Sequence, residues 1–146
     1  MTLRAYGSLF GARHGEQSPQ VLALHGWGRT RSDFDRLLDG SRAIALDLPG
    51  FGASPAPDRP VGAAGYARLV EPILHEFDSP PVVVGHSFGG RVAVALAASR
   101  PDLVAGLVLV GVPLLRPTGA GRKPSIAYRL VRLGARLGVI APERLE

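Results

Sequence analysis

The sequence contains no cysteine and no long hydrophobic run, and each absence excludes classes of protein. Without cysteine there is no disulfide framework, no thiolate nucleophile and no Cys-based zinc or iron–sulfur site. The longest apolar run, residues 103–115, falls short of the roughly 18–20 residues that cross a bilayer. Residues 1–6 lack the features of a secretory signal. We therefore expect a cytoplasmic protein whose nucleophile, if it has one, is Ser, Thr, Lys or a carboxylate.

Net positive charge is absent from most of the chain and concentrated at its end. The formal net charge is +5 for 146 residues, of which 46% are hydrophobic, as in one globular domain. Basic and acidic residues are equal in number over residues 1–111, so the excess belongs to residues 112–146. No nucleic-acid-binding motif accompanies these charges, and we expect no nucleic-acid partner.

Nearly continuous apolar runs alternate with helix-like segments. Runs of this kind suit strands buried on both faces of a parallel sheet, and their alternation with helices indicates a doubly wound, mostly parallel α/β fold. Two shorter segments before them predict an opening hairpin, which brings the sheet to about six strands. The runs are residues 21–25, 43–47, 81–85 and 104–112, and the hairpin segments are 3–8 and 9–13.

Helix chemistry occupies the segments between the runs. Residues 32–35 fit a capping box, and the apolar residues after them predict a helix that ends at Gly40. An apolar stripe over residues 66–77 has helical spacing, although Pro72 implies a kink or a break. The Gly- and Ala-rich residues 89–99 predict a helix that lies close to the sheet.

The clearest functional signal is a G-x-S-x-G sequence, Gly85-His86-Ser87-Phe88-Gly89, between an apolar run and the small-residue helix. This context fits a nucleophile elbow, in which a tight strand-to-helix turn exposes the serine hydroxyl and the flanking glycines relieve the crowding. An ordinary turn serine in a Gly-rich loop is the alternative. We predict that Ser87 occupies such an elbow.

Two other apolar runs end in loops of unusual composition. The first run ends in His25-Gly26-Trp27-Gly28, whose backbone N–H groups suit a developing oxyanion. The second ends in Asp47-Leu48-Pro49-Gly50-Phe51-Gly52, followed by Ser54. Because the carboxyl ends of parallel strands meet at one edge of a sheet, the three loops should border one crevice.

These three motifs, in this order and at this spacing, resemble the α/β-hydrolase superfamily over residues 3–112. The similarity is greatest to small esterases, lipase-like enzymes and C–C bond hydrolases. It implies that Ser87 is the nucleophile and that the backbone N–H groups of Trp27 and Phe88 form an oxyanion hole. The implied chemistry is acyl transfer from a small ester-like substrate to water, with no metal and no cofactor. A serine at this position argues against the branches that use a carboxylate nucleophile.

The other motif residues are expected to support these loops. His25 or His86 would serve as a substitute base for Ser87, or would brace the loops by hydrogen bonds. Asp47 would act as the catalytic acid, or would accept N–H groups of the Pro-Gly turn that follows it. We favour bracing in both cases. The supporting residues are His25, Gly26, Gly28, Asp47, Gly85, His86 and Gly89.

The resemblance breaks after Ser87. In this superfamily an acid and then a histidine follow the nucleophile, but every histidine of this sequence lies at or before position 86. The later acidic residues are Asp102, Glu143 and Glu146, and Asp102 precedes a strand, which puts it at the wrong end of the sheet. About two of the eight usual strands are also missing. We therefore expect the N-terminal portion of a serine hydrolase, whether truncated, split or degenerate, that is inactive or weakly active alone.

The composition changes near residue 112. We expect residues 1–112 to form the incomplete hydrolase core, and residues 113–146 to form a linker and the start of a cap helix. The apolar residues of that helix are Ile126, Leu130, Leu133 and Leu137, beside Arg129, Arg132 and Arg136. A basic amphipathic helix would cover the acyl pocket or lie on a membrane surface, and we favour the cap.

The strand at residues 104–112 would be left as an exposed apolar edge. Such an edge predicts self-association or pairing with a complementary C-terminal fragment. Two alternatives to a simple serine hydrolase follow. The chain would be a non-catalytic interaction or membrane-surface module, or one half of a split hydrolase whose histidine arrives on a second chain.

Overall fold

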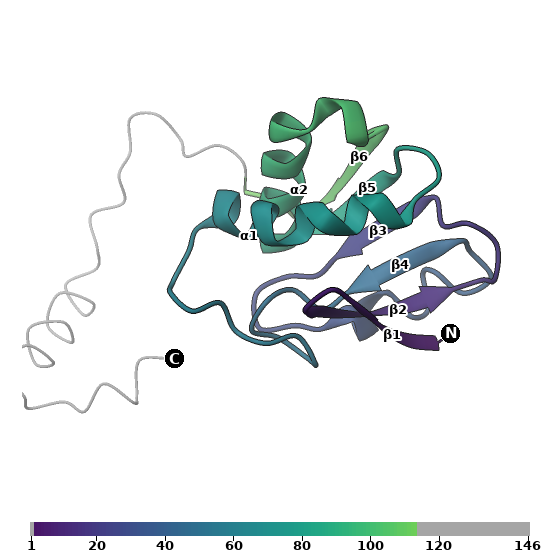
Figure 1. The fold of residues 1–146 in the computed structure, drawn as a ribbon, viewed down its shortest axis with the longest axis horizontal. Coiled ribbons are helices and arrows are strands. Elements are labelled where there is room, and N and C mark those ends of the chain that lie inside the picture. The colour runs from purple at the N-terminus through teal and green to yellow at the C-terminus, as the bar shows by residue number, and fades with distance from the viewer. Residues whose placement is uncertain (1, 114–146) are drawn as a thin grey trace, which may run out of the picture. The chain divides into compact units, whose positions relative to one another are not determined.

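A six-stranded sheet forms the centre of residues 2–113, which are the part of the chain that the computed structural model describes (Figure 1). The strand order is β1-β2-β4-β3-β5-β6. Four neighbouring strands are parallel, namely β4, β3, β5 and β6. The other two, β1 and β2, form an antiparallel hairpin, and β2 also pairs antiparallel with β4. The predicted α/β fold and the opening hairpin are confirmed. The strands are β1 (Thr2–Tyr6), β2 (Leu9–His14), β3 (Val21–Leu24), β4 (Ala43–Leu46), β5 (Val82–His86) and β6 (Gly106–Val110).

The register of the central strands brings their carboxyl ends level. Leu24, the last residue of β3, pairs with Leu46 at the end of β4 and with Gly85 near the end of β5. All four residues of β4 are buried, as expected for a strand covered on both faces. The three motif loops therefore leave the sheet at the same edge.

Two α-helices and three short 3₁₀ segments complete the described part. In Figure 1 the helices α1 and α2 lie together, and they pack against each other and, through α2, on β5. The predicted break in the 66–77 stripe is present, because α1 ends at Val70 and a 3₁₀ helix containing Pro72 follows. The helices are η1 (Arg31–Phe34), α1 (Ala63–Val70), η2 (Glu71–Glu76), α2 (Phe88–Ser99) and η3 (Pro101–Leu103).

The predicted capping-box helix over residues 32–40 is wrong. Only the single 3₁₀ turn η1 forms there, preceded by Thr30 and without a side-chain cap. The Ser32 hydroxyl bonds to the Thr30 hydroxyl, and Asp35 donates its backbone N–H to the Ser32 carbonyl at 3.2 Å. Phe34 and Leu38 are buried in the core, but Leu37 between them is 67% exposed, and one turn is enough to place the two buried side chains.

The last described strand, β6, is shorter than the predicted strand over residues 104–112 and lies at the edge of the sheet. Its side chains from Leu107 to Val110 are 36–50% exposed. The predicted linker and cap helix lie outside residues 2–113, so the boundary at residue 112 stays a prediction. Within those residues no helix is both long and apolar enough to cross a membrane.

Candidate active site

Ser87 occupies a strained turn between β5 and α2. Its backbone has φ 50° and ψ −110°, and among the described residues it is the only non-glycine with positive φ. Such a conformation costs about 1–3 kcal/mol and persists only where the surroundings impose it. Here the Ser87 N–H donates to the Val110 carbonyl at 2.9 Å, and β5 and α2 hold the residues on either side. This geometry fits the elbow that the G-x-S-x-G motif predicts.

The glycines of the motif permit the close approach of α2 to the sheet. A Cβ atom on Gly85 would lie 2.4 Å from the Cα of Gly90. A Cβ atom on Gly89 would lie 2.1 Å from the Leu24 carbonyl oxygen, far inside van der Waals contact. Any side chain at either position would push α2 away from β3 and β5, and with it the turn that exposes Ser87.

The loop after β3 lies against this turn. A Cβ atom on Gly26 would be 3.5 Å from the Cβ of Ser87, and Gly28 has a φ of +69° that favours glycine. The ring centroids of Trp27 and Phe88 are 5.2 Å apart, edge to face. The two residues expected to form the oxyanion hole are therefore neighbours. No hydrogen bond within residues 2–113 uses either of their backbone N–H groups.

His25 ties the loop after β3 to the loop after β4. Its ring is fully buried, Nε2 accepts the Leu48 N–H at 2.9 Å, and Nδ1 lies 2.7 Å from the Gly26 carbonyl oxygen. Because an amide N–H can only donate, the proton of the neutral ring must reside on Nδ1 and be donated to Gly26. Burial lowers the pKa of His25, which keeps the ring neutral. Neither nitrogen is free to accept the Ser87 proton.

Asp47 holds the loop after β4 in place. The carboxylate is fully buried, and it accepts the backbone N–H of Arg31 at 2.9 Å and that of Ala53 at 3.0 Å. It also forms an ion pair with the Arg31 guanidinium. The Ser54 hydroxyl donates to the Asp47 carbonyl at 2.7 Å and accepts the Phe10 N–H at 2.9 Å. With both carboxylate oxygens engaged, Asp47 acts as a brace between segments.

Comparison with known proteins identifies the family. The model of the family described as "Alpha/beta hydrolase family" matches residues 21–145. This chain belongs to the alpha/beta hydrolase family. Esterase Rv0045c of Mycobacterium tuberculosis is 38% identical over 110 residues, which cover 73% of this chain and 37% of that relative. Lipase LipV of the same organism is 42% identical over 102 residues, which cover 67% of this chain and 39% of the relative.

Solved structures of alpha/beta hydrolases superpose on the same core. The crystal structure of the M. tuberculosis esterase matches with a TM-score of 0.69 and 36% identity, over 75% of this chain and 40% of that one. That of the N-acyl homoserine lactonase AidH matches with a TM-score of 0.67 and 26% identity, over 77% of this chain and 46% of that one. The chain thus spans about two fifths of the length of the curated relatives it matches.

The remaining histidines of this hydrolase chain differ in their distance from the elbow. His86 is half-buried next to Ser87, and a Cβ atom on Gly26 would be 3.1 Å from its Nδ1. His14 pairs with Ala43 at the amino end of β4, the opposite end of the sheet from Ser87. His75 is exposed on η2. Among the four histidines, only His25 and His86 therefore lie near Ser87.

The acidic residue closest after Ser87 in sequence lies at the wrong edge of the sheet. Asp102 is in η3, which precedes β6, and β6 begins beside Val82 at the amino end of β5. Its carboxylate pairs with Arg100 at 3.2 Å, and this hydrogen bond lowers the pKa of Asp102. Over residues 2–113 no three His, Asp or Glu side chains converge as a metal site would require.

An aromatic cluster at the site was missed by the sequence analysis. Trp27, 64% exposed, contacts Phe51 and Phe88 edge to face, with ring centroids 5.1 Å and 5.2 Å apart. Tyr66 of α1 joins the cluster through Phe88, at 5.0 Å. Each of the three motif loops supplies one aromatic ring, and this regularity was the signal available in the sequence. The rings form an apolar surface directly beside the elbow.

Proposed function

We propose that this chain carries the nucleophilic part of a serine esterase. Ser87 Oγ would attack the carbonyl carbon of a small ester-like substrate, and the N–H groups of Trp27 and Phe88 would bind the oxyanion. The alcohol then leaves with a proton, and water hydrolyses the resulting acyl-enzyme. The observation that carries the proposal is the positive φ of Ser87 between β5 and α2. The names esterase, lipase and lactonase among the relatives support ester bonds as the substrate class.

Ser87 needs a base to take its hydroxyl proton, and the lack of one limits the esterase activity of the chain alone. A serine hydroxyl without a base is a weak nucleophile, and both nitrogens of His25 are already engaged. The sequence has no histidine beyond His86, and its acidic residues after Ser87 are Asp102, Glu143 and Glu146. Loss of the base in a serine triad lowers turnover on the order of 10⁶-fold. We expect little or no esterase activity from the 146 residues by themselves.

The exposed β6 edge favours a second candidate, in which this chain is one part of a two-part hydrolase. Leu107 to Val110 are 36–50% exposed, and a further parallel strand on β6 would cover them. The polypeptide that supplies this strand would also bring the base and the acid. The same edge permits self-association. A non-catalytic role for the basic tail concerns residues outside the described part.

A hybrid protein tests the proposal. Residues 1–113 of this chain are joined to the portion of the M. tuberculosis esterase that follows its matched region, and the product is treated with a fluorophosphonate. We expect one adduct on Ser87 by intact mass and hydrolysis of p-nitrophenyl butyrate, both abolished by Ser87→Ala. The 146-residue chain alone should stay unlabelled.

Two results would contradict the proposal. A folded hybrid that takes up no reagent would show that Ser87 is not a nucleophile even beside a complete triad. Turnover that survives Ser87→Ala would place the chemistry elsewhere. Labelling of Ser87 in the isolated chain would instead show that a base is already present, with His86 the candidate nearest the elbow.

A further inference from the structure

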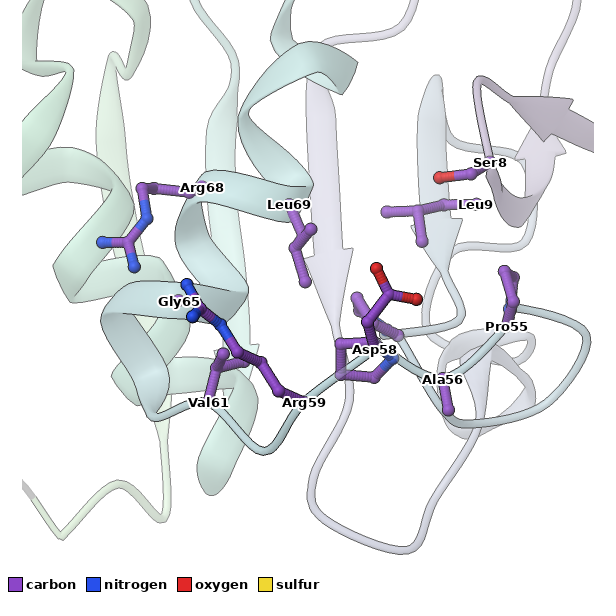
Figure 2. A pocket seen from close by; sticks show the side chains of 12 residues that line it. Ser8, Leu9, Pro55, Ala56, Asp58, Arg59, Val61, Gly65, Arg68 and Leu69 are labelled. Atoms are coloured by element: carbon purple, nitrogen blue, oxygen red, sulfur yellow. The ribbon is translucent and has the colours of Figure 1, made fainter.

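A cavity of about 800 Å³ is lined neither by Ser87 nor by the aromatic cluster of Trp27, Phe51, Tyr66 and Phe88. Its wall combines the β1–β2 turn at Ser8 and Leu9, the loop that follows β4, and one side of α1 (Figure 2). A volume of this size falls within the range of roughly 300–1,000 Å³ typical of small-molecule sites. The cavity therefore has room for a ligand of its own.

The cavity opens at the same edge of the sheet as Ser87. Strand β2 runs antiparallel to β4 with Gly11 opposite Leu46, so Leu9 lies beyond the carboxyl end of β4. Helix α1 separates the two sites. Tyr66 contacts Phe88 on the Ser87 side, whereas Gly65, Arg68 and Leu69 line the cavity.

The lining combines apolar walls with charged side chains that form no ion pair within residues 2–113. Of the ion pairs found in residues 2–113, none involves Asp58, Arg59 or Arg68. In Figure 2 both arginine side chains are seen on one side of Leu69 and the Asp58 carboxylate on the other. Two guanidinium groups against one carboxylate leave the cavity net positive. The apolar walls are formed by Leu9, Pro49, Pro55, Pro57, Val61 and Leu69.

We infer that this cavity binds an amphiphilic anion, a molecule with an apolar chain and a carboxylate or phosphate head. The chain would pack on the prolines and on Leu9 and Leu69, and the head would accept hydrogen bonds from Arg59 and Arg68. A guanidinium matches the planar oxygens of such a head with paired N–H donors. Asp58 repels the same head and so selects against ligands that carry more than one negative charge. The inference does not depend on the chemistry of Ser87.

Calorimetric titration of the 146-residue chain with decanoate tests this site. Decyltrimethylammonium and decanol serve as probes with the same chain and a different head. We expect one decanoate per chain and at least tenfold weaker binding of the other two. Arg59→Gln and Arg68→Gln should each weaken decanoate binding about fivefold, as expected for a partly exposed ionic contact. Asp58→Asn should strengthen it.

Three controls decide where and why the ligand binds. Arg36→Gln, which removes an exposed arginine outside the cavity, should leave the affinity unchanged. Leu69→Ser should weaken binding of decanoate, and Trp27→Leu should not. Equal affinity for all three probes, tighter binding of the cation, or no binding of decanoate would overturn the inference. Loss of binding in Trp27→Leu would overturn it too, since the ligand would then occupy the aromatic cluster beside Ser87.

Discussion

Acidification should weaken the fold by protonating His25. The buried ring accepts the Leu48 N–H at Nε2 and donates from Nδ1 to Gly26, so it joins the two loops only while neutral. A proton on Nε2 would replace that acceptor with a donor facing the Leu48 N–H. Burial is the main cause of the lowered pKa of His25, which places the folded-state value below the ordinary 6.5.

The size and sign of the effect follow from proton linkage. Below about pH 6.5 the unfolded chain takes up a proton on this histidine, and the folded chain does not until the pH reaches the lowered pKa. Between these two values the free energy of unfolding should fall by up to about 1.4 kcal/mol for each pH unit. The contribution is complete above pH 6.5 and is lost as the pH decreases. Burial also lowers the pKa of His14, which adds an effect of the same sign.

Urea unfolding of the wild type and of His25→Gln between pH 5 and 8 measures this contribution. The wild type should lose stability more steeply than the variant below pH 6.5, and His75→Gln, at an exposed position, should behave as the wild type. NMR titration of the imidazole gives an independent reading. An imidazole of His25 that titrates at or above pH 6.5 in the folded chain would refute the reasoning.

Three further substitutions, two of them with a matched control, test other parts of the structure. Gly89→Ala should lower the free energy of unfolding in urea by about 3 kcal/mol or more, because the added Cβ would meet backbone atoms. The control Gly106→Ala, with open space around its Cβ, should be neutral or stabilising. Equal effects of the two substitutions would contradict the account of the elbow. Asp47→Asn should lower the free energy of unfolding by about 2 kcal/mol through weakened charged hydrogen bonds, against almost no change for the exposed Asp58→Asn. We predict that the exposed β6 edge leads to self-association in sedimentation velocity and that Val108→Lys reduces it; a monomeric wild type or an unchanged distribution in the variant would contradict this role of β6.

Much of the fold could be predicted because its signals are local. The strands β3, β4 and β5 lie in the middle of the sheet and are covered on both faces, so each appears in the sequence as a nearly continuous apolar run. The elbow could be predicted because only small residues fit at Gly85 and Gly89, and the chain displays this requirement as a motif. Pro72 likewise predicts the end of α1, because proline breaks a helix whatever the helix packs against.

The failures concern contacts between distant segments. The apparent capping box at residues 32–35 has the right residues, but the Ser32 hydroxyl bonds to Thr30 instead of capping a helix, and only one 3₁₀ turn forms. The contacts of Trp27 with Phe51 and Phe88 join three loops that only the parallel register brings together. The hydrogen bond between His25 and Leu48 joins residues 23 positions apart. His25 accepts it from a backbone N–H, and the sequence does not show which backbone N–H will lie next to the ring. Sequence patterns predict the strands and helices, whereas these side-chain contacts form only once the sheet is assembled.

The strand order has a consequence for a polypeptide emerging from the ribosome. Once β4 has paired with both β2 and β3, β5 adds to the free side of β3, and β6 then adds to the free side of β5. Neither β5 nor β6 has to enter between two strands that are already joined. After β4 has paired, the sheet therefore grows at one edge only, in the order in which the strands are synthesised. Each new strand covers the edge that the strand before it had left exposed.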